Sequence, residues 1–113
     1  MGDKFIKKNK EDIEAQLTNH GVGQKKIFAE KAACQSNLTQ AAWGMLKRGE
    51  AVKPHIHLTM EEFYYFESGE LNFYIAAKKL LCKKGDFVMV PAGVEHFLEA
   101  QADCAFVYWG ISI

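Results

Sequence analysis

Apolar and polar residues alternate in short runs along most of this 113-residue chain, a period-two pattern typical of strands that bury one face. The strands expected from this pattern are residues 25–29, 38–46, 53–58, 62–67, 71–76, 79–83, 86–91, 95–100 and 105–113. Turn sequences such as "ESGE", "KKGD" and "PAG" separate several of them, and their glycines can adopt the positive φ of tight turns. Many short strands joined by such turns predict an all-β sandwich or barrel.

One segment near the N-terminus has helical spacing. In residues 9–17, "NKEDIEAQL", Ile13 and Leu17 are four apart, as on one face of a helix. An edge strand fits this segment equally well, and both alternatives stay open. The length suits a single domain over 1–113, with an N-terminal extension and the first strands in 1–35.

The charge balance disfavours a nucleic-acid partner. Lysine plus arginine and aspartate plus glutamate number 14 each, so the formal net charge is zero, whereas nucleic-acid binders usually show a basic balance or face. The only local excess, residues 4–10, is interpreted as a solvated N-terminal segment. We see no signal-peptide pattern and no run near the roughly 20 apolar residues of a membrane span, and therefore expect a cytoplasmic protein without a membrane partner.

The three cysteines carry no pairing pattern. Cys34, Cys82 and Cys104 are widely spaced and form no CxxC motif, so neither a disulfide framework nor a thiolate zinc site is indicated. We interpret them as small buried apolar residues in a reducing compartment.

Histidines and glutamates gather in residues 49–69, "GEAVKPHIHLTMEEFYYFESG". His55 and His57 are two apart, which places them on one face of a strand, and Glu62 would lie beside them if the next strand is their neighbour. His96 opens a later strand. Three imidazoles and a carboxylate suit one divalent transition metal such as Fe, Mn, Ni, Zn or Co, although on spacing alone surface or core histidines remain an alternative.

The same residues carry a resemblance to the cupin superfamily. Residues 49–69 resemble its first motif, G(X)5HXH(X)3–4E(X)6G, and residues 85–100 its second, G(X)5PXG(X)2H(X)3N. The matching residues are Gly49, His55, His57, Glu62 and Gly69 in the first motif, and Gly85, Pro91, Gly93 and His96 in the second. Ala100 stands where the second motif ends in asparagine.

This resemblance implies a small, single-domain RmlC-like cupin, a double-stranded β-helix or jelly-roll barrel with a short N-terminal extension. It implies His55, His57, Glu62 and His96 as ligands of one metal ion per chain. It also selects Glu62 over Glu61, because only Glu62 leaves six residues before the motif glycine. Glu61 then faces the other side of its strand.

Strand parity suggests which residues line a pocket. Tyr64 and Phe66 share the face of Glu62, and Leu98 and Val94 share that of His96. Tyr64 is the candidate catalytic residue, because a phenol beside a metal can orient a substrate or act as an acid; a plain core role is the alternative, and we favour it for Phe66.

The facing of three further side chains bears on the pocket. The sequence does not fix the facing of Gln40 or Trp43, because the register is unknown. His20 lies in the turn sequence "TNHGVGQ" and is not expected to be a ligand.

Basic residues point to the class of substrate. Arg48 is the only arginine and sits in a turn sequence, and most of the lysines fall in terminal or turn-like segments: 4–10, 25–26, 78–79 and 83–84. Phosphate sites commonly use arginine forks. We therefore expect a small, weakly charged or carboxylate ligand rather than a nucleotide-sugar or phosphosugar.

Two classes of function follow. The first is a metalloenzyme of the dioxygenase, decarboxylase or isomerase type, and the second is a non-catalytic small-molecule or metal-binding protein; a metal-free structural barrel is disfavoured by the four intact positions. The apolar segment 106–113, "FVYWGISI", is either an interface strand of a homodimer or a core strand of the monomer.

Overall fold

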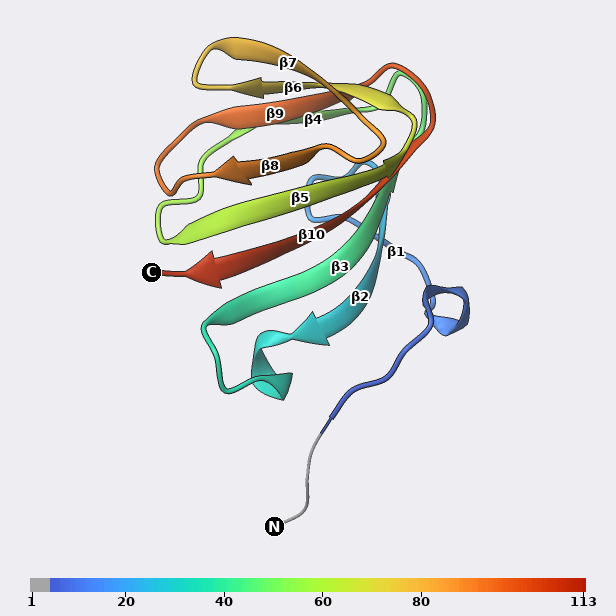
Figure 1. The fold of residues 1–113 in the computed structure, drawn as a ribbon, viewed down its shortest axis with the longest axis vertical. Coiled ribbons are helices and arrows are strands. Elements are labelled where there is room, and N and C mark those ends of the chain that lie inside the picture. The colour runs from blue at the N-terminus through green and yellow to red at the C-terminus, as the bar shows by residue number, and fades with distance from the viewer. Residues whose placement is uncertain (1–4) are drawn as a thin grey trace.

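The computed structural model describes residues 5–113, in which strands account for nearly all regular structure (Figure 1). The strands are β1 (Gln16–Leu17), β2 (Gln24–Glu30), β3 (Leu38–Leu46), β4 (Ala51–His55), β5 (Met60–Ser68), β6 (Glu70–Ile75), β7 (Lys78–Lys83), β8 (Phe87–Val90), β9 (His96–Ala100) and β10 (Cys104–Ser112). Two short 3-10 helices, η1 (Lys10–Asp12) and η2 (Lys31–Ala33), flank β1 and β2. The predicted all-β class is confirmed.

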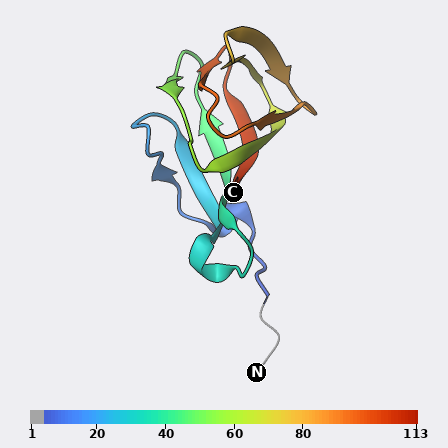
Figure 2. The ribbon, with the colours of Figure 1, turned by 90° about the vertical axis from the view of Figure 1, so that its left-hand side faces the viewer.

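The strands form two antiparallel sheets. The six-stranded sheet has the order β1-β2-β3-β10-β5-β8, and the four-stranded sheet has the order β4-β9-β6-β7. The sheets curve around a shared interior, as Figures 1 and 2 show from two directions. Consecutive strands often belong to different sheets, which is the jelly-roll arrangement that the sequence motifs implied.

The interior is filled by the residues that the period-two pattern places inward. On β5, Tyr64 and Phe66 are buried, whereas Tyr65 between them is 46% exposed. On β9, Leu98 and Ala100 are buried. Both sets belong to one hydrophobic cluster that joins the two sheets, so burial of the alternating apolar faces helps to hold the sheets together.

The helical alternative for residues 9–17 is wrong. Asn9 caps a single 3-10 turn by accepting a hydrogen bond from the Glu11 amide at 2.9 Å, and the chain is extended again at Ile13. Leu17 is 64% exposed and lies in the edge strand β1, which pairs with β2. Leu17 is not part of the core cluster, and a helix of this length without such packing is marginal in water.

The expected strand over residues 53–58 is displaced. β4 ends at His55 because its partner β9 begins at His96, directly opposite, and later residues have no strand to pair with. His57 therefore follows the strand instead of lying within it. The remaining predicted strands agree with the observed ones to within one or two residues at each end.

Two of the three cysteines are buried, as expected. Cys82 and Cys104 are buried, and burial raises the pKa of each thiol to about 11, as expected for inert core residues. Cys34 is only partly buried, so the expectation is wrong there.

Segment 106–113 lies largely in β10, the strand between β3 and β5; the core-strand alternative is correct, and the segment has no open edge for an interface strand.

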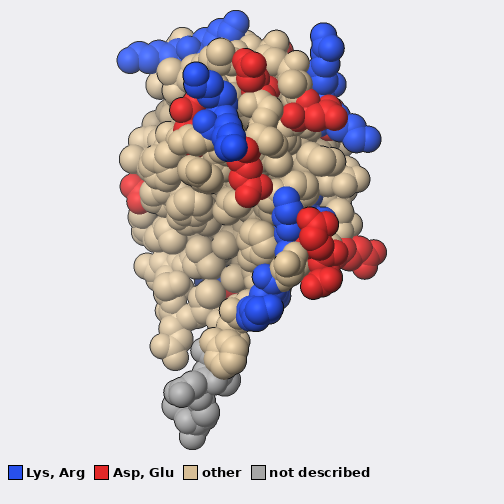
Figure 3. Space-filling view, turned by 45° about the vertical axis from the view of Figure 1, so that its right-hand side comes forward, with Lys and Arg blue, Asp and Glu red and all other residues tan. Residues whose placement is uncertain are grey.

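Charged side chains of both signs lie near one another on the face in Figure 3, and its described residues form no broad patch of one sign. In the lysine-rich segment 4–10, residues 5–9 are exposed, while Lys4 lies outside the described residues. No helix within residues 5–113 is long and apolar enough to cross a membrane.

The motif glycines all occupy the left-handed region. Gly49, Gly69, Gly85 and Gly93 have φ of +86°, +77°, +91° and +83°, which residues with a Cβ rarely adopt. Gly69 is also sterically constrained: a Cβ there would collide with the Asp103 carbonyl oxygen and lie 2.7 Å from the Cα of Cys104. Gly85 has open space around it.

These two glycines separate backbone strain from steric overlap. We expect Gly85→Ala to cost about 1–2 kcal/mol, the left-handed penalty alone, and Gly69→Ala to cost about 3 kcal/mol or more, because the backbone of the adjoining turn must also move. Urea unfolding of both variants measures the difference. Equal losses would show that the close approach at Gly69 has no energetic weight.

Candidate metal centre

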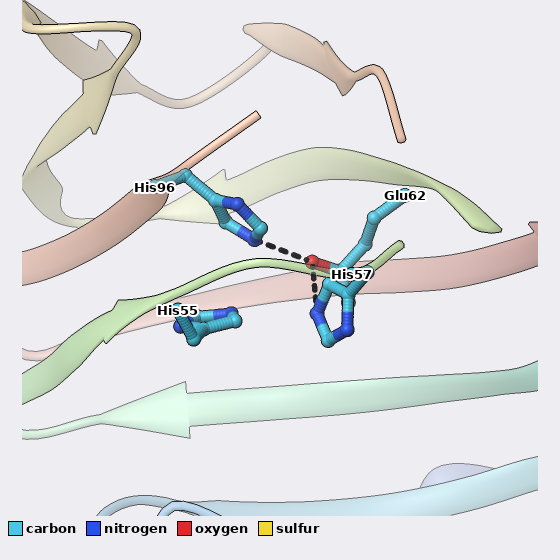
Figure 4. Close-up of side chains that lie close together, drawn as sticks. All are labelled: His55, His57, Glu62 and His96. Atoms are coloured by element: carbon cyan, nitrogen blue, oxygen red, sulfur yellow. Dashed lines mark hydrogen bonds and ion pairs between the residues drawn. The ribbon is translucent and has the colours of Figure 1, made fainter. Parts of the chain in front are cut away.

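Four side chains converge at one end of the barrel. His55 ends β4, His57 follows it, Glu62 lies on β5 and His96 begins β9. One ligand atom from each, an imidazole nitrogen or a carboxylate oxygen, lies within 4.8 Å of all the others. Figure 4 shows the rings and the carboxylate directed toward a common point. These are the four residues that the cupin resemblance implied.

The cluster is assembled across both sheets. His55 and His96 are direct partners in the register of β4 and β9 in the four-stranded sheet. Glu62 comes from β5, which pairs with β10 and β8 in the six-stranded sheet. The expectation that the glutamate strand pairs beside the histidine strand is therefore wrong: Glu62 meets the imidazoles from the opposite wall of the barrel.

Backbone carbonyls orient two of the rings. Nδ1 of His55 lies 2.8 Å from the Lys53 carbonyl oxygen, and Nδ1 of His96 lies 3.0 Å from that of Val94. Because a carbonyl only accepts, each Nδ1 is the nitrogen that carries a proton. The remaining lone pair of each neutral imidazole is then on Nε2, which is the usual arrangement in metal-ligating histidines.

The second motif holds His57 through its backbone. The amide of Gly93, in the turn "PAG", donates to the His57 carbonyl oxygen at 2.8 Å. Gly93 can make this contact with φ of +83°. The turn before β9 thus fixes the segment after β4, which explains how His57 reaches the cluster without belonging to a strand.

One oxygen of Glu62 receives three contacts. The Tyr64 hydroxyl donates to Oε1 at 2.7 Å, Nε2 of His96 lies 3.1 Å away, and Nε2 of His57 lies 3.6 Å away. Burial opposes ionisation of this carboxyl, but the contacts with His57, His96 and Tyr64 outweigh it and lower the pKa of Glu62 well below its usual range. The site therefore holds a carboxylate at neutral pH.

The histidines near this carboxylate have unequal basicity. Burial lowers the pKa of His55 to about 4, with smaller contributions from neighbouring histidines and against a hydrogen bond to Lys53. The contact with Glu62 raises the pKa of His57 above 6.5, against the effect of burial. At physiological pH His55 is therefore neutral and can offer a nitrogen lone pair to a metal, whereas His57 keeps its proton to a higher pH.

Two of the candidate ligand atoms lack a hydrogen-bond partner. Nε2 of His55 and Nε2 of His57 are buried, and neither has a hydrogen-bond partner among residues 5–113. His96 has an acceptor at each ring nitrogen, yet a neutral ring carries only one N–H. Lone pairs and a carboxylate facing one another are compatible with a bound cation, so the residues present fit a divalent metal ion.

A cavity of about 270 Å³ opens beside the cluster. Its lining includes His57, Glu62, Tyr64, Leu98, Phe106 and Tyr108. Tyr64 and Leu98 thus lie where strand parity placed them. Burial raises the pKa of Tyr64 well above 10, and the charge of Glu62 adds to this, so the phenol stays protonated. Phe66 is in the core cluster, as favoured.

The other residues singled out in the sequence take different positions relative to the cavity. Gln40 lines the cavity, whereas Trp43 faces outward and donates from Nε1 to Glu67 Oε1 at 2.9 Å. Val94 packs against the core cluster. Glu61 is less buried than Glu62 and alternates with it along β5, in agreement with the predicted outward facing.

His20 is closer to the site than the sequence suggested. It lies in a turn, as expected, and is not one of the four clustered residues. Its ring centroid is nevertheless 4.3 Å from that of His55, and it lines the cavity. Burial lowers the pKa of His20. No local signal marks this placement, because it depends on the β1–β2 hairpin folding over the cavity.

Solved structures of known proteins share this fold. A predicted oxalate decarboxylase from Thermotoga maritima has 23% identity and a TM-score of 0.85, covering 97% of this chain and 100% of its own. An RmlC-like cupin from Shewanella frigidimarina has 16% identity and a TM-score of 0.79, covering 94% and 89%. The polyketide cyclase RemF from Streptomyces resistomycificus has 12% identity and a TM-score of 0.82, covering 96% and 80%.

At these identities the solved structures show a shared fold and nothing finer. No curated protein is significantly similar to this chain in sequence. Residues 42–110 match the cupin domain family, a segment that contains all four clustered residues. Because this match spans more than half of the sequence, the chain belongs to the cupin domain family.

Proposed function

We propose that His55, His57, Glu62 and His96 bind one divalent transition metal and that the protein is a metalloenzyme acting on a small molecule. The observation that carries the proposal is the pair of buried Nε2 atoms without hydrogen-bond partners, beside an ionised carboxylate at the wall of a cavity. A structural barrel would gain by replacing such groups with apolar ones.

The reaction class is that of dioxygenases, decarboxylases or isomerases. A bound metal would supply a Lewis acid or a site for dioxygen. The protein itself provides a largely apolar wall, including Leu98 and Phe106, which limits water around the reacting groups. A predicted decarboxylase and a cyclase among the similar structures support small-molecule chemistry without selecting a reaction.

Tyr64 is proposed as a positioning residue. Its hydroxyl donates to the same Glu62 oxygen that faces His57 and His96. Because the pKa of the buried phenol lies well above 10, holding the carboxylate in place suits it better than giving up its proton.

The alternative is a non-catalytic protein that binds a small molecule or the metal alone. The same cavity and donor set would serve it. Ligand-induced stabilisation without product formation would identify this class.

Further proposals concern the setting of the protein. We retain a single cupin domain over 1–113, a cytoplasmic location and a homodimer as proposals. The outward face of the six-stranded sheet supports a dimer, because Phe63 and Trp109 stack there at 5.6 Å between ring centroids and Phe87 is 57% exposed.

The ligand assignment predicts the metal content. Protein purified without added metal should carry about one divalent ion per chain by elemental analysis. The double variant His57→Ala, Glu62→Ala should lose it, since half of the donors are removed. Glu61→Ala, on the opposite face of β5, is the matched control and should keep it. Full metal content in the double variant would refute the assignment.

The unequal basicity of the histidines predicts a pH-dependent affinity. Protons and metal compete for the same nitrogens, so the affinity for Zn²⁺ should fall from about pH 7.5 to about pH 5.5, by about tenfold per unit for each proton displaced. His57, with its raised pKa, competes earlier than His55 as the pH falls. Competition with a chromophoric chelator measures this. His20→Gln should leave the slope unchanged, and a pH-independent affinity would contradict the site.

The enzyme proposal predicts turnover that depends on Tyr64. Iron- or nickel-loaded protein should consume oxygen or form product with at least one member of a panel of diketones, thiols and phenols. Tyr64→Phe should lower turnover about 10- to 100-fold with unchanged metal content, whereas Tyr65→Phe, on the outward face, should not. No turnover with any loaded metal would favour the non-catalytic alternative.

A further inference from the structure

A buried lysine faces the cavity from β2. Lys25 is 5% exposed and lines the cavity, whereas its neighbours Gln24 and Lys26 are more exposed. In the strand register Lys25 lies opposite Gly44, which has no side chain to compete for the interior. Lys25 and Lys26 both lie in β2, so the strand expected over 25–29 is confirmed and the turn-like description of 25–26 is wrong; Lys25 is inside the barrel.

This ammonium group has little compensation. Its one hydrogen-bond partner among residues 5–113 is Oε1 of Gln40, at the long distance of 3.4 Å. The ion pairs within the same residues are those of Glu62 with His57 and His96, so no carboxylate pairs with Lys25. Lysine is rarely buried unless paired, because desolvating its charge costs several kcal/mol.

The strand register relates this lysine to the metal centre. Gln40, Gly110 and Glu62 are adjacent across β3, β10 and β5, and all three line the cavity. With strands about 4.8 Å apart, Gln40 and Glu62 are separated by roughly 10 Å between backbones. Lys25 and Gln40 thus lie on the same six-stranded sheet as Glu62, with Gln40 two strands away from the carboxylate of the centre.

The chemistry of this wall selects the class of ligand. One ammonium and one amide can satisfy the two oxygens of a single carboxylate. Arg48, the only arginine of the sequence, does not line the cavity, and phosphate commonly requires several such donors. The volume of about 270 Å³ is at the lower end for ligand pockets, which favours a molecule of few atoms.

We propose that Lys25 and Gln40 form a subsite for the carboxylate group of a small organic acid. The other end of that acid then faces Glu62 and the histidines. This placement as a substrate rests on the proposed function, but the anion subsite itself does not. A buried cation without a carboxylate partner in the ligand-free protein is explained by the anion that it binds.

A purely structural role for Lys25 makes opposite predictions about stability. If Lys25 supports the fold through Gln40, Lys25→Met lowers the unfolding temperature. If it is kept for an anion, Lys25→Met replaces an uncompensated charge by an apolar chain of similar length, which should raise the unfolding temperature of the ligand-free protein while weakening anion binding.

The test uses propionate as the anionic probe and propionamide as its neutral counterpart. Each is titrated into EDTA-treated and zinc-loaded protein, and binding is followed through the side-chain amide signals of Gln40 by NMR. We expect propionate to bind more tightly than propionamide, and Lys25→Met to weaken propionate at least tenfold. Lys26→Met is the matched control, because Lys26 faces outward over Trp43, and it should change binding less than twofold.

The outcomes separate this proposal from the metalloenzyme. Lys25-dependent propionate binding in EDTA-treated protein supports the subsite even if no metal or turnover is ever found. Equal propionate binding by Lys25→Met and the unchanged protein overturns it, as does a lowered unfolding temperature of Lys25→Met without loss of binding. Tighter binding of inorganic phosphate than of propionate overturns the carboxylate class.

Discussion

The position of the Glu62 carboxylate is the constraint on which the site depends. It projects from the six-stranded sheet and meets imidazoles held by the four-stranded sheet, with Nε2 of His96 at 3.1 Å. A one-residue slip of β5 would turn Glu62 outward and bring Glu61 in, and would also expose Tyr64 and Phe66. The same alternation that buries the core therefore fixes the facing of the carboxylate, and the site cannot be displaced without dismantling the barrel.

Because the core and the site share the same strands, packing of the core can offset the cost of burying the unpaired atoms of the cluster. The Nε2 atoms of His55 and His57 are buried without partners, an arrangement that destabilises a ligand-free protein. The surrounding core compensates, with Phe66 and Phe73 fully buried and the Phe73 ring parallel to His96 at 6.2 Å. Unsatisfied groups inside well-packed surroundings are typical of places where a structure is arranged for a ligand rather than for stability.

The four clustered residues could be predicted from the sequence because the spacing of the motifs reflects which positions of a strand and its turns face inward. Gly93 shows why the spacing is strict: its left-handed backbone brings its amide to the His57 carbonyl. Which strands pair with one another was harder to predict from the sequence. A period of two reveals that His55 and Glu62 face the interior, but not that they belong to opposite sheets, because partner choice is set by long-range contacts.

The same reasoning explains why the placement of Lys25 was not predicted. In "QKK", if the strand reaches residue 24, the period of two places one of the two lysines inward. Two adjacent polar residues offer no apolar contrast that would show which lysine faces inward. They also do not show that the strand begins as early as residue 24. Only the pairing of β2 with β3 places Lys25 inside. Burial of a charge is a tertiary property, and local patterns report it poorly.

The division of the chain also bears on specificity. The family match covers residues 42–110 and contains the donor cluster, whereas His20 and Lys25 precede it and line the cavity from β2 and the hairpin before it. Members that share the matched segment can share a metal centre while differing in the wall that faces it. If that wall recognises the ligand, as the buried Lys25 indicates, then the shared motifs determine the chemistry available at the centre, and the N-terminal strands determine which molecule is presented to it.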